Sequence, residues 1–144
     1  MAARADAIST KGSSDYLSRS QRGPVLTGVM DPQTGEIFYG MNQGAVPSDL
    51  HPLLQDRLDA YLDATGGITP LRAGIPGSHS EIVALDQAIK ARELWQGFPV
   101  TESSLSDFLL SNRTLIGERR VIGIPPRCPN CAVITNGVQT VGGN

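Results

Sequence analysis

Two short motifs hold the side chains of this sequence that could do chemistry together. His79-Ser80-Glu81 lies where a loop gives way to a helical pattern, and Cys128 and Cys131 lie in the segment PPRCPNC. One imidazole and two thiols are ligands that zinc prefers, and they are one short of the four that close a structural site. A fourth position left for water is typical of a catalytic zinc. The sequence therefore predicts a Zn²⁺ site made of His79, Cys128 and Cys131.

The local sequence around each motif favours this site. Cys128 and Cys131 are three residues apart, which on the first turn of a helix puts both sulfurs on one face. The positive end of the helix dipole lowers the pKa of a thiol there, and Pro129 suits an early helical position. We expect Ser78 to cap the other helix, which places His79 at its entry. Glu81 could then move protons to and from the water on zinc, first as a general base and then as a general acid.

Simpler interpretations exist for the same residues. Ser78-x-x-Glu81 also fits a capping box, in which Glu81 would only satisfy backbone N–H groups. A C-x-x-C pair after a strand and before a helix also fits a thioredoxin-like redox site, although that interpretation gives no reason for His79 and Glu81. His51 has no partner motif, and we expect it to cap a helix or to face solvent.

The paired motifs resemble a known superfamily. H-x-E followed by a Pro-preceded C-x-x-C is the signature of the zinc-dependent nucleobase deaminases, with the departure that Arg127 stands between the prolines and Cys128. More narrowly, SHSEIVALDQAI together with PPRCPNC and FYGMN resembles the YwqJ-like deaminase toxins of bacterial polymorphic toxin systems, in particular those that deaminate cytosine in single-stranded DNA. The resemblance extends from about Gly23 to Val141.

This resemblance implies a fold, an activity and partners. The fold would be α/β, a cytidine-deaminase-like three-layer α/β/α sandwich with a central mixed sheet. Cytosine in single-stranded DNA would be converted to uracil, with zinc on His79, Cys128 and Cys131 and with Glu81 as proton shuttle. Asn42 and Ser78 would contact the substrate. The domain would be part of a secreted effector that acts in the cytoplasm of a target cell, and a cognate immunity protein would protect the producer.

Two other functions stay open from the sequence. The chain could deaminate free cytidine, deoxycytidine or their nucleotides, or RNA, because the preference for single-stranded DNA comes from the resemblance alone. It could also be a binding module without catalysis, in which zinc only clamps two helices together. Arg119, Arg120 and Arg127 border the cysteine loop and could hold phosphates, although such residues are ordinarily solvated.

Composition limits the remaining possibilities. The 144 residues, 40% apolar and 18% charged, suit a single domain, and a formal charge of −2 excludes a histone-like polycation. One Trp, three Tyr and three Phe are too few for a channel of many stacked bases, so a site that grips a few nucleotides is expected. We find no apolar run near the roughly 20 residues of a membrane span and no signal peptide, and we expect a monomer without membrane contact.

The pattern along the chain gives the elements that must position the motifs. Residues 1–22 look like a tail or linker with at most a short helical turn, and residues 23–144 form the expected domain. Two strands separated by a turn at DPQTGE predict a hairpin, and helices are expected at about 48–66, from 78 or 79 to 94, and at 101–110. A buried strand at 120–124, a helix after Cys128 and a short strand at VQTV follow. Phe38 and Tyr39 should face opposite sides of their strand, and Trp95, Phe98 and Phe108 should pack in the core.

Overall fold

A mixed four-stranded sheet forms the centre of the molecule in the computed structural model, which describes residues 1–70, 73–115 and 124–142. Strand β1 (Val25–Asp31) pairs antiparallel with β2 (Glu36–Met41) and with β3 (Leu109–Thr114), and β3 pairs parallel with the two-residue strand β4 (Gln139–Thr140). The strand order is β2-β1-β3-β4. The predicted hairpin, the last short strand and the mixed α/β class are confirmed.

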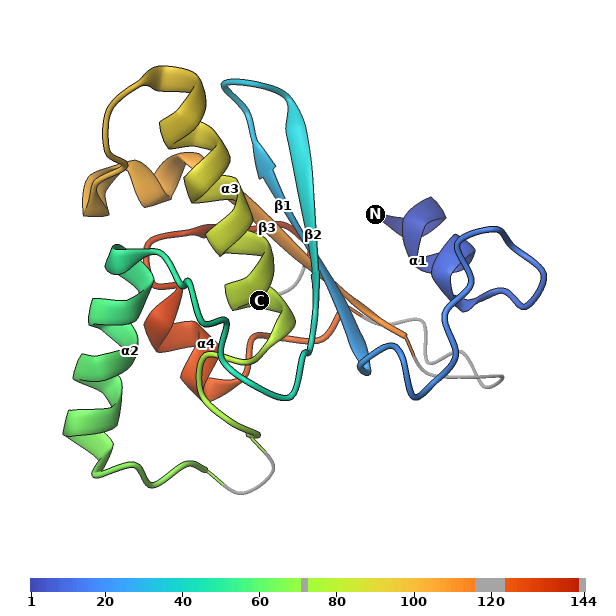
Figure 1. Cartoon of the computed structure of the whole chain (residues 1–144), viewed down its shortest axis with the longest axis horizontal. Helices are drawn as coiled ribbons and strands as arrows, with labels where there is room; N and C mark the ends of the chain where they lie inside the picture. Colours follow the sequence, from blue (N-terminus) through green and yellow to red (C-terminus); the bar gives the residue numbers. More distant parts are fainter. Residues whose placement is uncertain (71–72, 116–123, 143–144) are drawn as a thin grey trace.

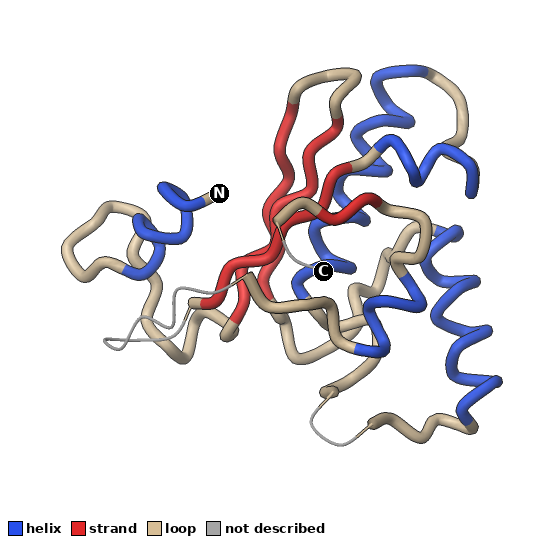
Figure 2. Tube along the Cα trace, turned by 180° about the vertical axis from the view of Figure 1, so that it is seen from behind, coloured by secondary structure: helices blue, strands red, loops and turns tan. Residues whose placement is uncertain are grey.

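Three helices cover one face of the sheet (Figures 1 and 2). They are α2 (Pro52–Thr65), α3 (Ser80–Gln96) and the short α4 (Pro129–Ile134). Helix α3 packs directly on β1 and β2, and its backbone lies so close to Gly40 that a Cβ there would stand 2.3 Å from the Ser80 carbonyl oxygen. Any larger side chain at Gly40 would therefore push away the turn of α3 that carries Ser80 and Glu81.

The second face of the sheet is covered by the N-terminal segment. Residues 1–22, expected as a tail, contain helix α1 (Ala2–Ser9), which lies on the side of the sheet away from α2, α3 and α4 in both views (Figures 1 and 2). Ile8 is buried there with Leu26 and Leu115. The fold thus has helices on both faces of the sheet. Among the described residues, α1 is the helix on the second face.

The aromatic side chains differ in how deeply they are buried. Phe38 packs against this core and Tyr39 against the α1 side, which confirms that they face opposite ways. Phe108 is fully buried, as expected, but the prediction for Trp95 and Phe98 is wrong, since they are 62% and 63% exposed. These two residues lie in the last turn of α3 and just beyond its end at Gly97, past the stretch of the helix that faces the sheet.

Two predicted elements differ from the structure. The helix expected at 101–110 is a 3₁₀ helix, η1 (Glu102–Asp107), followed by β3. Strand β3 was missed because its inward positions alternate Leu110 with Asn112, a polar residue that is buried through its hydrogen bonds. The strand expected at 120–124 lies outside the described residues apart from Ile124, as do Arg119 and Arg120. No helix in the described ranges combines the length and the apolar character needed to cross a bilayer.

Candidate metal centre and its cavity

The start of α3 and the start of α4 bring three ligands together. His79 Nδ1 lies 3.1 Å from Cys128 Sγ and 3.2 Å from Cys131 Sγ, and all three ligand atoms lie within 4.8 Å of one another. His79 is the N-cap residue of α3, and Cys128 is the N-cap residue of α4, with Cys131 one turn later. The structure therefore groups the three residues that the sequence predicted as metal ligands.

Each helix start has a local cause. The Cys128 sulfur accepts a hydrogen bond from the backbone N–H of Cys131, and Pro129 occupies the first helical position, where the missing N–H costs nothing. The predicted cap of α3 is wrong. Ser78 is not the cap, because its hydroxyl donates to the Ile75 carbonyl oxygen and holds the preceding turn, while His79 takes the N-cap position without a side-chain cap bond.

Asn42 caps the same helix from the end of β2. Its Oδ1 accepts a hydrogen bond of 3.1 Å from the backbone N–H of Ser80, which satisfies one of the free donors at the start of α3. Asn42 also lines the cavity beside the ligands, whereas Ser78 is not among the lining residues. The capping-box interpretation of Glu81 is wrong, since its carboxylate contacts Ser80 and Asn112 side chains.

The protonation of the three ligands suits a metal. A hydrogen bond from the Cys131 thiol, with a further one from His79, lowers the pKa of Cys128 to about 4 although its burial acts the other way. The neighbouring Cys128 sulfur and burial both raise the pKa of Cys131. The hydrogen bond to Cys128 raises the pKa of His79, against the effect of its partial burial. A metal ion would therefore meet a thiolate at Cys128 and would compete with protons for the other two residues.

The donor set and its spacing fit zinc. A tetrahedral zinc with two Zn–S bonds and one Zn–N bond needs ligand atoms roughly 3.5–3.8 Å apart, a small expansion of the observed cluster. Two sulfurs and one imidazole are also the soft and borderline ligands that zinc prefers over calcium or magnesium. On the other side of the ring, His79 Nε2 faces Gly74, where a Cβ would stand only 2.6 Å away. Gly74 thus lets the loop support the imidazole at close range.

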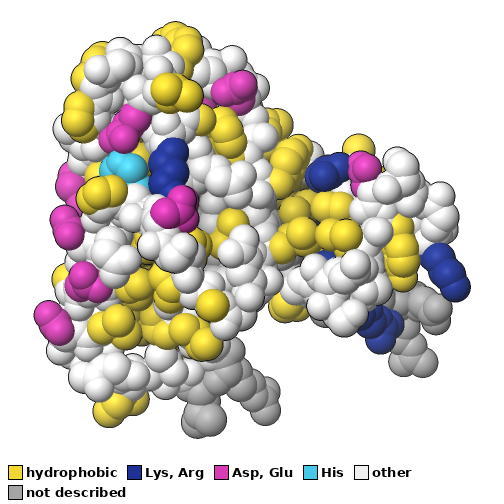
Figure 3. Space-filling model, in the orientation of Figure 1, with side chains coloured by type: hydrophobic (Ala, Val, Ile, Leu, Met, Phe, Trp, Pro, Cys, Tyr) yellow, Lys and Arg dark blue, Asp and Glu magenta, His cyan; other side chains and the backbone are white. Residues whose placement is uncertain are grey.

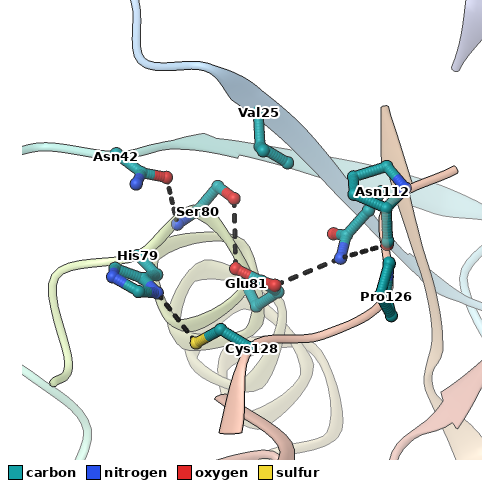
Figure 4. A pocket seen from close by; sticks show the side chains of 9 residues that line it. Val25, Asn42, His79, Ser80, Glu81, Asn112, Pro126 and Cys128 are labelled. Carbon is teal, nitrogen blue, oxygen red and sulfur yellow. Dashed lines mark hydrogen bonds between the residues drawn. The ribbon is translucent and has the colours of Figure 1, made fainter. Parts of the chain in front are cut away.

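A small cavity opens beside the ligands (Figure 4). Its volume is about 130 Å³, well below the roughly 300 Å³ at which pockets for drug-sized ligands begin, so it suits one small ring. Glu81, 5% exposed, presents its carboxylate to the cavity between the ligands and Asn112. The lining residues are Val25, Asn42, His79, Ser80, Glu81, Asn112, Pro125, Pro126 and Cys128.

Three residues of this site escaped the sequence interpretation. Asn112 donates 3.1 Å to Glu81 Oε1, and Thr27 and Ser80 complete the hydrogen bonding around it. A buried polar residue within a strand is the signal that could have indicated Thr27 and Asn112, but a sequence alone does not show which strand positions are buried. Arg127, considered for phosphate binding, instead donates to the carbonyl and hydroxyl oxygens of Thr135 at the end of α4.

Comparison with known proteins places this site in context. A family model described as YwqJ-like deaminase matches residues 9–140. The chain is 32% identical over 142 residues to "Toxin YwqJ" of Bacillus subtilis (strain 168), which covers 89% of this chain and 21% of that protein. It is 30% identical over 94 residues to "Toxin subunit YenC2" of Yersinia entomophaga, 65% of this chain and 9% of that protein. The chain thus spans a small part of either relative, and no solved structure matches it.

Proposed function

Because this chain belongs to the YwqJ-like deaminase family, we propose that it is a zinc-dependent deaminase that converts cytosine to uracil in single-stranded DNA. The observation that carries the proposal is the position of Glu81 in the same cavity as the ligand cluster of His79, Cys128 and Cys131. A carboxylate beside a metal and inside a ring-sized cavity is what hydrolytic deamination of a base requires. By analogy with its toxin relatives, we further propose that the domain acts as a secreted effector in a target cell and has a cognate immunity protein.

The chain's own residues divide the work. His79, Cys128 and Cys131 would hold zinc, which when bound supplies a Lewis acid and a water of lowered pKa. Glu81 would take one proton from the attacking water and deliver it to N3 of cytosine, and it would then carry the second proton of that water to the departing amine. Cytosine and water thus give uracil and ammonia. Asn42 lines the cavity, and we propose that its amide nitrogen contacts the base or the sugar, whereas Ser78 would reach a substrate from the turn beside the cavity.

The distribution of charge supports a polynucleotide as the substrate. Residues 1–22 carry four cations and two acidic residues, a net charge of +2, so the rest of the chain carries −4 of the total of −2. Acidic side chains gather along the α2 and α3 side, and Lys and Arg side chains appear on the N-terminal part (Figure 3). A phosphate backbone could therefore contact the Lys and Arg side chains of the N-terminal part.

A substrate panel with a Glu81 variant tests the proposal. Zinc-loaded protein is incubated with single-stranded DNA, double-stranded DNA, RNA, cytidine and dCTP, and uracil and released ammonia are measured. We expect turnover on single-stranded DNA and a loss of about 10²–10⁴-fold in kcat for Glu81→Gln with zinc retained. Glu36→Gln, at an exposed position of β2, is the matched control and should keep full activity.

Each other result has a defined meaning. Turnover of cytidine or dCTP would establish the small-molecule alternative, and turnover of RNA alone would move the enzyme to RNA. A protein that binds one zinc per chain but turns over none of these substrates would be the zinc-stabilised binding module. Full activity of metal-free protein would overturn the zinc site.

A further inference from the structure

Glu81 belongs to a closed ring of polar contacts of hydrogen-bond length with three other side chains. Ser80 Oγ donates 3.2 Å to Glu81 Oε2, and Asn112 Nδ2 donates 3.1 Å to Glu81 Oε1. Thr27 Oγ1 closes the ring, since it lies 2.8 Å from Ser80 Oγ and 2.6 Å from Asn112 Oδ1. The ring therefore ties both oxygens of one carboxylate to β1 and β3 as well as to α3.

The members of the ring are almost completely removed from solvent. Thr27 and Ser80 are 0% exposed, Asn112 is 3% exposed and Glu81 is 5% exposed. In such surroundings a polar group that loses its partner is costly, so each bond constrains the next one. Ser80, Glu81 and Asn112 line the cavity, but Thr27 does not. Within the described part of the chain, the side-chain hydrogen bonds of Thr27 reach the cavity through Ser80 and Asn112.

The neighbours of Asn112 on both sides fit one orientation of its amide. The Asn112 oxygen can only accept a hydrogen bond, and the Thr27 hydroxyl is the donor beside it. The Asn112 nitrogen donates to Glu81 and, at 3.4 Å, to the Pro125 carbonyl oxygen, and both of these groups can only accept (Figure 4). The reverse orientation would place the amide oxygen against the carboxylate, where two acceptors repel each other. The same amide thus links Glu81 to the loop that leads to Cys128.

We propose that Thr27 and Asn112 are positioning residues that hold the Glu81 carboxylate in one orientation beside the ligand cluster, with Thr27 acting solely through Asn112 and Ser80. The link to turnover rests on the proposed function of Glu81 as the proton carrier. A carboxylate that moves protons in both directions needs fixed geometry, because proton transfer depends on hydrogen-bond distance to the reacting groups.

Substitutions at Thr27 test this role. Thr27→Val removes the hydroxyl at nearly constant volume, and Thr27→Ser keeps it. With zinc-loaded protein and a cytosine-containing single-stranded DNA oligonucleotide, we expect Thr27→Val to lower kcat about 10–100-fold while KM stays within about twofold. Thr27→Ser should recover most of kcat. Thr65→Val, which loses a hydroxyl that donates to the backbone at the end of α2, is the matched control and should behave as wild type.

A structural readout keeps the test independent of turnover. Crystal structures of zinc-loaded wild type and Thr27→Val would show the Glu81 carboxylate in one position in the wild type and displaced or in several rotamers in the variant. An unchanged Glu81 in the variant, an unchanged kcat, or a Thr27→Ser variant as impaired as Thr27→Val would each overturn the proposal. Absence of turnover in the wild type with a displaced Glu81 in the variant would reject the proposed function and retain the positioning role.

Discussion

At the level of single residues, Cys128 and Cys131 contribute unequally to the ligand cluster although they are three residues apart. Cys128 is half-buried at the N-cap of α4, and its pKa is lowered to about 4, so it offers a thiolate at neutral pH. Cys131 lies inside the first turn, is 1% exposed and has a raised pKa. Cys128 is therefore the ligand that is ready to bind a metal ion first.

Removal of this thiolate should weaken zinc binding strongly. For Cys128→Ser we expect the zinc affinity to fall by more than about 100-fold, because a hydroxyl neither ionises at neutral pH nor matches the softness of a thiolate. Metal analysis after dialysis against a weak chelator measures this, with circular dichroism to check that the variant is folded. A variant that still holds one zinc per chain would show that Cys128 is not a ligand.

At the level of elements, a buried ion pair fixes the far end of α3 to the sheet. The Arg92 guanidinium donates to both oxygens of Asp31 at the end of β1 and lies 4.7 Å from the centre of the Phe108 ring. The side chains of Arg92 and Asp31 are both 1% exposed. A carboxylate oxygen of the more exposed Asp107 lies 3.3 Å from the Arg92 guanidinium. Together with the close approach at Gly40, this pair sets the position of the whole helix that begins with His79.

The ion pair makes stability depend on pH. Burial raises the pKa of Asp31, but hydrogen bonds from Arg92 and from the backbone of Gln33 lower it by more. The pKa of Asp31 in the folded protein therefore lies below the ordinary value of 3.8. A lowered folded pKa contributes stability that is complete above about pH 4 and is lost as the pH falls through the folded pKa. The ion pair should therefore stabilise the protein fully at neutral pH and progressively less in acid.

Asp31→Asn should reveal this contribution. At pH 7 we expect the free energy of unfolding to fall by about 3 kcal/mol, because the buried Arg92 guanidinium loses its buried carboxylate partner. Denaturant titrations at pH 7 and pH 3 measure the effect, and the difference from wild type should narrow at pH 3. Asp107→Asn, at a side chain that is 44% exposed, should change the free energy by less than about 1 kcal/mol. Equal losses for Asp31→Asn at both pH values would contradict the pH dependence.

For the whole molecule, the N-terminal segment decides how the second face of the sheet is covered. Ile8 packs with Leu26 and Leu115, and the partly buried side chains of Met1, Ala5, Leu17, Tyr39 and Met41 surround them. Every residue that lines the cavity lies at position 25 or later. The segment thus contributes to folding without lining the cavity, and residue 23 as the start of the catalytic domain stays a prediction.

A shortened chain separates these two contributions. We expect residues 23–144 alone to lose at least the burial of Ile8, about 1.5–3 kcal/mol of unfolding free energy, because Leu26 and Leu115 become exposed. Zinc content should remain at one per chain. Denaturant unfolding and metal analysis measure both quantities, and a shortened chain as stable as the full one would show that residues 1–22 are only a linker.

The sequence by itself determined the candidate ligand residues and the helices that carry them. His79, Cys128 and Cys131 were found because a histidine and a C-x-x-C pair are rare, chemically distinctive residues whose spacing is set by the first turn of a helix. Helices α2 and α3 and the β1–β2 hairpin follow from periodicity and turn residues, which are local properties.

Only the tertiary structure decided what surrounds Glu81. Asn112 contacts Glu81, and Thr27 contacts Asn112 and Ser80, because antiparallel pairing sets Thr27 opposite Asn112 and because Gly40 lets α3 lie against that part of the sheet. Asn112 and Glu81 are 31 positions apart in the sequence, and Thr27 and Ser80 are 53 positions apart, so no local pattern encodes these contacts. The tertiary structure also decided that Trp95 and Phe98 are exposed. Periodicity shows which residues share a face of a helix, but it does not show where the neighbouring sheet ends.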